Sequence, residues 1–260
     1  MIKTPNVFNL IYSVVLWAIL LTVTLFFGIS VMPFALFRAR KAVHFGARMW
    51  GKSLAFLSRM TIQVKNKEKL YRGGPVIYLA NHQSMFDIAV FYSFLDTEFR
   101  WMAKASLFKI PFVGWGMTGA GYIPVERGDR KKAMESLFQA ADRIQGGASV
   151  IIFPEGTRSE NPHEGMLPFK KGAFVLAKKA NVTIQPITIW GAHHIMPAKQ
   201  KVWVQRIYPG LVQVEVHDPI SPEESGKMDQ EQLSAHVRTV IERPMKVMLE
   251  TLDDNEKKRG

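Results

Sequence analysis

An apolar run from position 6 to position 37 contains no charged side chain and is dominated by Leu, Ile, Val and Phe. About 20 such residues suffice to cross the hydrocarbon core of a membrane as a helix. The run is about twice as long as the apolar region of a signal peptide and lacks a clean small-x-small cleavage site before Arg38. We therefore expect an N-terminal helical membrane anchor. The sequence leaves open whether it crosses the bilayer or bends back at Gly28 or Pro33.

The stretch at 38–60 follows directly and places six cations and no anion among bulky apolar residues. This composition is typical of an amphipathic helix in the headgroup layer, where Lys and Arg reach anionic lipids, although a solvated charged face is the alternative. Positions 1–67 carry nine Lys and Arg and no Asp or Glu, so most of the net charge of +12 lies there. The positive-inside bias predicts that the domain after these cations lies on the cytoplasmic face of a membrane.

Composition limits the partners and the chemistries that the protein can have. With 260 residues, 47% hydrophobic and 22% charged, the protein can form one catalytic domain plus an accessory segment. The concentration of positive charge beside the apolar run favours an anionic membrane as partner and argues against nucleic acid. There are no cysteines, which excludes disulfides, Cys-ligated zinc, iron–sulfur clusters and acyl-cysteine chemistry.

From residue 61 onward, short β-rich runs alternate with helical patterns, which predicts an α/β domain with a mixed central β-sheet flanked by helices. The expected organisation is an N-terminal membrane-anchoring segment at 1–60 (apolar 6–37, basic amphipathic 38–60) and an α/β domain at 61–260. We expect strands at 61–65, 75–80, 99–104, 121–126, 148–153, 182–190, 201–207 and 211–217. We expect helices at 85–95, 130–145, 170–180 and 230–252, the last interrupted by Pro244.

Two segments match phosphate-binding motifs only formally. The run at 46–53 fits GxxxxGK[ST], but it lies in the basic amphipathic stretch and follows no buried strand. The run at 114–119 fits GxGxxG, but Pro111 precedes it and a β-like GYIPVE follows, so a turn is expected there. The sequence holds no GxSxG motif, and His193-His194 has no metal-ligand spacing with carboxylates, so we expect that pair at a loop or strand end and predict no metal site.

The first segment with chemical promise is Asn81-His-Gln-Ser-Met-Phe-Asp87, which lies where the apolar run PVIYLA meets a helical pattern. His82 in the loop and Asp87 one turn into the helix can meet through Nδ1 of the imidazole, which leaves Nε2 to take a proton. Of the seven histidines, only His82 has an Asp five residues later. The spacing predicts a His–Asp pair at a strand-to-helix corner.

The second segment is Phe153-Pro-Glu-Gly-Thr-Arg-Ser159, which follows the apolar run ASVII. Gly156 permits a tight turn, and Arg158 offers a planar guanidinium that suits a phosphate monoester. A β-turn with a solvated Arg is the alternative. A third segment, Gly121-Tyr-Ile-Pro-Val-Glu-Arg127, also ends a predicted strand with a cation.

Together these segments resemble the glycerolipid acyltransferase family with the HxxxxD motif, and within it the bacterial-type 1-acylglycerol-3-phosphate acyltransferases. NHQSMFD is similar to the first block of the family, GYIPVER to the second, FPEGTRS to the third, and IQPITIW with Pro186 to the fourth. The blocks match in order and spacing over roughly residues 70–195, although Pro124 departs from the usual pattern of the second.

The resemblance implies that His82 is the general base and Asp87 its orienting partner. The second and third blocks would hold the phosphate of the acceptor, a role that falls to Arg158 and Arg127, with Lys104 as a third cation. It also implies a supporting role for several motif residues, among them Glu155, which would brace the turn, and Ser84, which would support the loop: Asn81, Ser84, Glu155, Gly156, Thr157 and Pro186.

The expected reaction transfers a fatty acyl group from acyl-CoA or acyl carrier protein to the sn-2 hydroxyl of 1-acylglycerol 3-phosphate (lysophosphatidic acid), which makes phosphatidic acid for phospholipid biosynthesis. The thioester carrier is a co-substrate, and no cofactor is expected. The expected setting is the cytoplasmic face of a bacterial inner membrane. Two alternatives remain: an acyltransferase that acts on an amino-lipid or on glycerol 3-phosphate, and a non-catalytic lipid-binding module.

Overall fold

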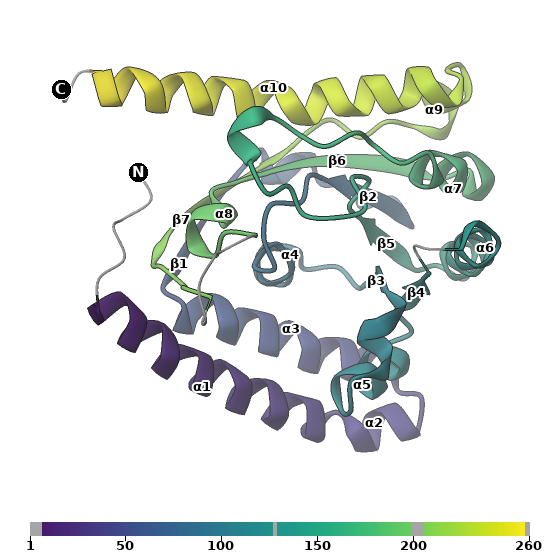
Figure 1. Cartoon of the computed structure of the whole chain (residues 1–260). Helices are drawn as coiled ribbons and strands as arrows, with labels where there is room; N and C mark the ends of the chain where they lie inside the picture. Colours follow the sequence, from purple (N-terminus) through teal and green to yellow (C-terminus); the bar gives the residue numbers. More distant parts are fainter. Residues whose placement is uncertain (1–6, 127–128, 199–204, 258–260) are drawn as a thin grey trace.

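The computed structural model describes residues 7–126, 129–198 and 205–257 (Figure 1). The apolar run forms α1 (Val7–Ser30) and the short α2 (Met32–Leu36), and the basic stretch forms α3 (Arg40–Leu57). The chain reverses direction between α2 and α3, where Arg38 takes a left-handed φ of 54°. α3 then packs back along α1, and the indole N–H of Trp50 donates to Oγ1 of Thr24 at 3.0 Å. The apolar run thus ends in a helical reversal.

Seven strands form one mixed sheet in the order β1-β7-β6-β2-β5-β3-β4. The five strands from β6 to β4 are parallel, and β7 pairs antiparallel with β6 and parallel with β1. The mixed α/β architecture expected from the sequence is therefore confirmed. The strands are β1 (Met60–Lys65), β2 (Val76–Ala80), β3 (Phe99–Lys104), β4 (Ile123–Val125), β5 (Ser149–Ile152), β6 (Thr183–Trp190) and β7 (Gly210–Val216).

Helices cover both faces of the sheet, as Figure 1 shows. The described helices α4 (Asp87–Phe94) and α3 lie on one face with α1 outside them, and α6 (Arg130–Gln145), α7 (Gly172–Ala180) and α10 (Gln230–Lys257) lie on the other. Every residue of β2, β5 and β6 is buried as a result. This explains why these strands read as continuous apolar runs rather than as alternating patterns.

The remaining described elements are short: η1 (Lys67–Lys69), η2 (Ala105–Lys109), α5 (Val113–Gly119), η3 (Pro162–Glu164), α8 (Ala192–Ile195) and α9 (Pro222–Gly226). The turn expected at 114–119 is wrong, because α5 occupies it. A Cβ on Gly114 would lie 2.1 Å from the carbonyl oxygen of Phe108, so glycine here serves close packing of α5 against η2. The formal GxxxxGK[ST] match lies inside α3.

Two further expectations need correction. α10 continues through Pro244, because an apolar stripe on both sides of the proline packs on the sheet and the Thr188 hydroxyl donates to the carbonyl of Ile241 at 2.8 Å. The stripe consists of Leu233, Val237, Ile241 and Met245. The strand expected at 201–207 is not seen at 205–207, and its first four residues lie outside the described part of the chain.

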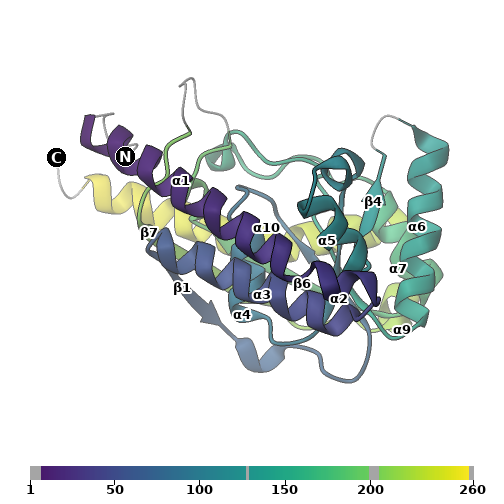
Figure 2. The same ribbon diagram turned by 90° about the horizontal axis from the view of Figure 1, so that it is seen from below.

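α1 is attached to the rest of the molecule along one flank only. The indole N–H of Trp17 donates to the Gln205 carbonyl at 2.6 Å, and the backbone N–H of Ile207 donates to Oγ of Ser13 at 3.2 Å. Leu16 and Leu20 are buried on the same flank. Its other sides expose apolar side chains, and within the described residues α1 is the helix that is long and apolar enough to cross a membrane. Figure 2 shows α1 and α3 on the same face of the molecule.

Candidate active site

Three loops leave neighbouring strands at the same edge of the sheet. β2 lies between β6 and β5, and all three are parallel, so the segments after Ala80, Ile152 and Trp190 emerge side by side. Ligands in open α/β sheets bind at this carboxyl edge. The segments that resemble the first and third family blocks are two of these loops, and α8 follows the third strand.

The buried Asp87 side chain organises the first loop. Its Oδ2 accepts from Nδ1 of His82 at 2.7 Å, from the backbone N–H of Gln83 at 2.7 Å and from the backbone N–H of Ser84 at 2.9 Å. Asp87 is also the first residue of α4, where the helix dipole favours negative charge. Because Oδ2 can only accept, Nδ1 carries the ring proton and Nε2 keeps its lone pair. The His–Asp meeting expected from the five-residue spacing is present.

The plane of the His82 ring is set by Phe153, for which the sequence predicts no role beyond its place at the start of FPEGTRS. The two rings stack with centroids 4.0 Å apart and an interplanar angle of 7°. Trp101 stacks behind Phe153 at 5.7 Å. A flat aromatic wall thus leaves His82 little freedom to rotate, and 15% of its side chain stays exposed. The signal that could have found Phe153 is its position as the first residue after β5.

Glu155 joins the first and third loops through the backbone. Its Oε1 accepts from the His82 N–H at 2.7 Å and its Oε2 from the Leu167 N–H at 2.8 Å. On the other side of the same residue, the carbonyl of His82 accepts from the Ser159 N–H at 2.8 Å. Glu155 therefore reaches beyond its own turn and holds the histidine in place. Burial raises the pKa of this carboxyl group to about 7, against the lowering effect of its two N–H donors.

Glu155→Gln is expected to change how stability depends on pH. The folded protein binds the Glu155 proton more tightly than the unfolded chain, whose pKa is near 4.5. The contribution of the carboxyl group is therefore fully present below about pH 4.5 and is lost as the pH rises through 7. Melting temperatures between about pH 5 and 8 should show that the advantage of wild type over Glu155→Gln shrinks with rising pH. A pH-independent difference would contradict this assignment.

Asn81 and Ser84 bind the first loop to β6 and to the segment after α8 through hydrogen bonds. The Asn81 side chain donates to the carbonyl of Ile189 and accepts from the N–H of the same residue, both at 2.8 Å, so it extends the β2–β6 pairing by one step. The Ser84 hydroxyl donates to the carbonyl of Met196 at 2.8 Å. Both side chains are buried. Pro186 lies within β6 opposite Leu79, and it contributes to the sheet below the loops.

The expected cations have different environments. Arg158 is half-buried, and its Nη1 is buried without a hydrogen-bond partner among the described residues. Lys104 is exposed at the end of β3, while Arg127 lies outside the described residues. Thr157 is exposed. A buried guanidinium nitrogen with no protein partner is costly unless a ligand supplies an acceptor.

Lys170 is a further cation at the third loop that the sequence analysis missed. Its backbone N–H donates to the Pro154 carbonyl at 2.8 Å, and its side chain lies across Gly156. A Cβ on Gly156 would lie 2.7 Å from Cε of Lys170, a flexible side chain that can move aside, so it is the φ of 72° that favours glycine here. The run FKKG close after FPEGTRS was the available signal.

A histidine with a free basic nitrogen, a buried carboxylate behind it and a guanidinium with one buried nitrogen left without a partner can activate a hydroxyl on a substrate that carries an anionic group. Such an arrangement suits a transferase or hydrolase that uses a general base. Comparison with known proteins gives the class: an acyltransferase family model matches residues 61–190, and the chain belongs to this family.

Individual relatives are also named as acyltransferases. A 1-acyl-sn-glycerol-3-phosphate acyltransferase of Escherichia coli is 32% identical over 85% of this chain and 90% of its own length. Enzymes of the same name from Chlamydomonas reinhardtii and from the chloroplast of Arabidopsis thaliana are both 37% identical, over 79% and 70% of this chain. The chain spans 61% and 49% of these two longer relatives.

A solved structure shares the fold. The crystal structure of the 1-acyl-sn-glycerophosphate (LPA) acyltransferase PlsC from Thermotoga maritima superposes with a TM-score of 0.76 at 29% sequence identity. The match covers 92% of this chain and 95% of that one.

Proposed function

We propose that this protein transfers a fatty acyl group from a thioester carrier, acyl-CoA or acyl carrier protein, to the sn-2 hydroxyl of lysophosphatidic acid and so makes phosphatidic acid. The observation that carries the proposal is the His82–Asp87 pair, with Nδ1 bound at 2.7 Å and Nε2 left as a base. The names of the relatives support the choice of acceptor.

The reaction needs no covalent enzyme intermediate. The acceptor hydroxyl attacks the thioester carbonyl while Nε2 of His82 takes its proton, and Asp87 stabilises the imidazolium that forms. The tetrahedral intermediate then collapses, the carbon–sulfur bond breaks, and His82 returns the proton to the leaving thiolate. The chain contains no cysteine, and the Ser84 hydroxyl is bound to the Met196 carbonyl, so neither supplies a nucleophile. The reaction requires no cofactor beyond the acyl carrier.

The phosphate of the acceptor is assigned to the cations around the third loop. Arg158 has a buried nitrogen without a partner, which a phosphate oxygen would satisfy. Lys170 and Lys104 add positive charge from the end of the third loop and from the end of β3. Arg127 joins this set through the family resemblance alone.

The N-terminal helices are assigned to the membrane, with residues 1–60 as the lipid-binding part and 61–260 as the catalytic part. The flank of α1 that carries Ser13 and Trp17 is bound to residues 205–207, which supports a hairpin of α1 and α3 that lies in one leaflet rather than a helix that crosses both. The side of α3 away from the core exposes a stripe that mixes basic and apolar side chains and suits the headgroup layer on the cytoplasmic face: Lys41, Phe45, Met49, Lys52 and Phe56.

Deletion of residues 1–37 is expected to weaken membrane residence. Full-length protein should stay with membranes through a high-salt wash, because apolar burial is not screened by salt. The truncated protein keeps only the short mixed stripe of α3, whose lysines are screened by salt, and should be released. Flotation with vesicles separates membrane-bound protein from aggregates. Truncated protein that floats with vesicles at high salt would show that the apolar run is not the main anchor.

The function itself is tested by product analysis. Purified full-length protein in detergent is given acyl-CoA or acyl carrier protein together with lysophosphatidic acid, glycerol 3-phosphate or an amino-lipid, and products are identified by mass spectrometry. Phosphatidic acid should be the main product. Preferential acylation of glycerol 3-phosphate or of the amino-lipid would establish a related acyltransferase instead. Vesicle binding without any acylated product would favour a non-catalytic lipid-binding module.

A further inference from the structure

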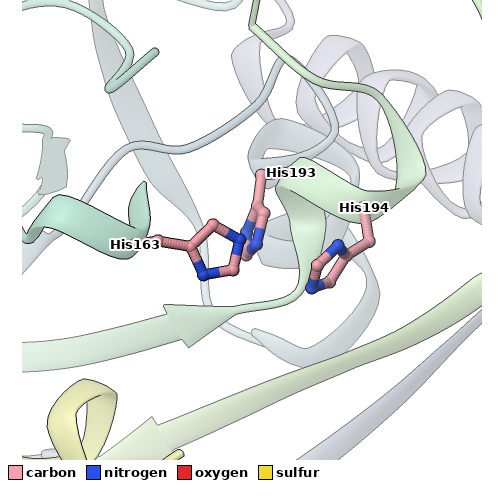
Figure 3. A group of neighbouring side chains, drawn as sticks. All are labelled: His163, His193 and His194. Atoms are coloured by element: carbon pink, nitrogen blue, oxygen red, sulfur yellow. The ribbon is translucent and has the colours of Figure 1, made fainter. Parts of the chain in front are cut away.

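Three histidines gather beside the catalytic loop, although they are not all close in the sequence. His163 lies on η3 in the loop after β5, and His193 and His194 lie on α8 after β6 (Figure 3). Ring centroids are 5.1 Å apart for His163 and His193, 3.9 Å for His193 and His194, and 5.9 Å for His163 and His194. One ring nitrogen from each lies within 4.8 Å of the others.

The central ring, His193, points to a ligand. The residue is 6% exposed, and its Nε2 is buried without a hydrogen-bond partner among the described residues. Its Nδ1 lies 2.9 Å from Oε1 of Gln83, and because that oxygen can only accept, Nδ1 carries the proton. Nε2 therefore holds a lone pair that accepts no hydrogen bond from the described residues. Metal-bound histidines show this pattern, with the second nitrogen donating to an oxygen.

The surroundings favour a cation that binds neutral imidazole. Burial lowers the pKa of His193 far below its ordinary value, and the neighbouring imidazoles lower it further. Burial also lowers the pKa of His194. Metal ions require the neutral ring. Trp190 closes one side, with its ring 4.9 Å from that of His193 and 5.8 Å from that of His163.

We propose that His163, His193 and His194 bind one divalent transition-metal ion, with Zn²⁺ as the ion that three imidazoles fit. Nitrogens bound at about 2.0–2.1 Å to a tetrahedral Zn²⁺ lie about 3.4 Å apart, so the rings must close by somewhat more than 1 Å. His163 and His194 are exposed and can turn toward the fixed ring of His193. Three protein ligands leave a fourth position for water.

The ion would act on the catalytic site by restraining the segments that surround it. It would join the loop after β5 to α8, and His193 would pass that restraint to Gln83, the residue after His82. The backbone N–H of Gln83 donates to the Asp87 carboxylate that holds His82. His163, His193 and His194 are therefore positioning residues, and the proposed acyl transfer does not pass through the ion.

Metal binding is tested on the full-length protein in detergent, without a polyhistidine tag and after treatment with a chelator. Titration with Zn²⁺ alone, followed by elemental analysis after dialysis, should give about one bound ion per chain. His163→Gln and His194→Gln each remove one exposed ligand and should weaken binding at least tenfold. The matched control is His236→Gln, because His236 is exposed on α10 and is not one of the three clustered histidines, and it should bind as wild type does.

Two further readouts separate a built site from adventitious binding. Co²⁺ in place of Zn²⁺ should give the visible absorption of a tetrahedral site in wild type and in His236→Gln, and should lose it in His163→Gln. At the same Zn²⁺ concentration the melting temperature of wild type should also rise more than that of His163→Gln, since stabilisation grows with the affinity of the folded state for the ion. Equal Zn²⁺ affinity in wild type and His163→Gln, or no bound ion in wild type, would overturn the proposal.

Discussion

His82→Ala is expected to lower kcat for acyl transfer by on the order of 10²–10⁴-fold, the usual contribution of a general base. The acceptor hydroxyl is a poor nucleophile at neutral pH, and among the described residues His82 is the one whose basic nitrogen is oriented by a buried carboxylate at this edge of the sheet. Asp87→Asn should also cause a steep loss, because an amide can present its N–H to Nδ1 and so favour the wrong tautomer.

The measurement is single-turnover kinetics on purified protein whose fold is verified by thermal melting. His236→Ala, on the exposed face of α10, is the matched control and should keep wild-type turnover. Near wild-type turnover of His82→Ala would contradict the proposed mechanism. That outcome is independent of whether Arg158 binds the phosphate.

Arg158→Ala is expected to lower kcat/KM toward lysophosphatidic acid by about 10–150-fold, which corresponds to roughly 1.5–3 kcal/mol for a charge-assisted hydrogen bond. The buried Nη1 without a partner is the structural reason, because a phosphate oxygen would satisfy it. Arg158→Lys should recover part of the loss, since a point charge cannot reproduce the planar fork of the guanidinium.

Acceptor and acyl donor are varied separately in these kinetics. Arg243→Ala removes an exposed arginine from α10 and serves as control, with an effect within about 0.5 kcal/mol. An unchanged KM for the acceptor together with a raised KM for the donor would move Arg158 from the phosphate site to the surface that binds the carrier.

Local patterns made the catalytic pair and the sheet predictable. His82 and Asp87 are five residues apart at one corner, so strand-to-helix geometry alone brings them together. Most strands and long helices were expected within a few residues of their observed bounds, because each has a strong apolar pattern. The return of α3 along α1 was left open, since the sequence of an apolar run does not show which flank it buries.

Contacts between loops were not predictable in the same way. The link from Glu155 to His82 and the meeting of His163 with His193 depend on β2 lying between β5 and β6, and the order of strands in space is not their order in the chain. Pro244 was expected to interrupt a helix because local propensity favours a break. Burial of the stripe on both sides of it outweighs that preference.

The backbone of His82 is held on both sides by the third loop, through Glu155 at its N–H and Ser159 at its carbonyl. The backbone segments that carry the base and the cation next to Ser159 are therefore joined directly, so these two hydrogen bonds restrain the spacing between the backbones of His82 and Arg158. A bound acceptor would place its hydroxyl at His82 and its phosphate at Arg158. Selection among lyso-lipids would then act on the length of the polar part between those two groups, whatever the length of the acyl chain.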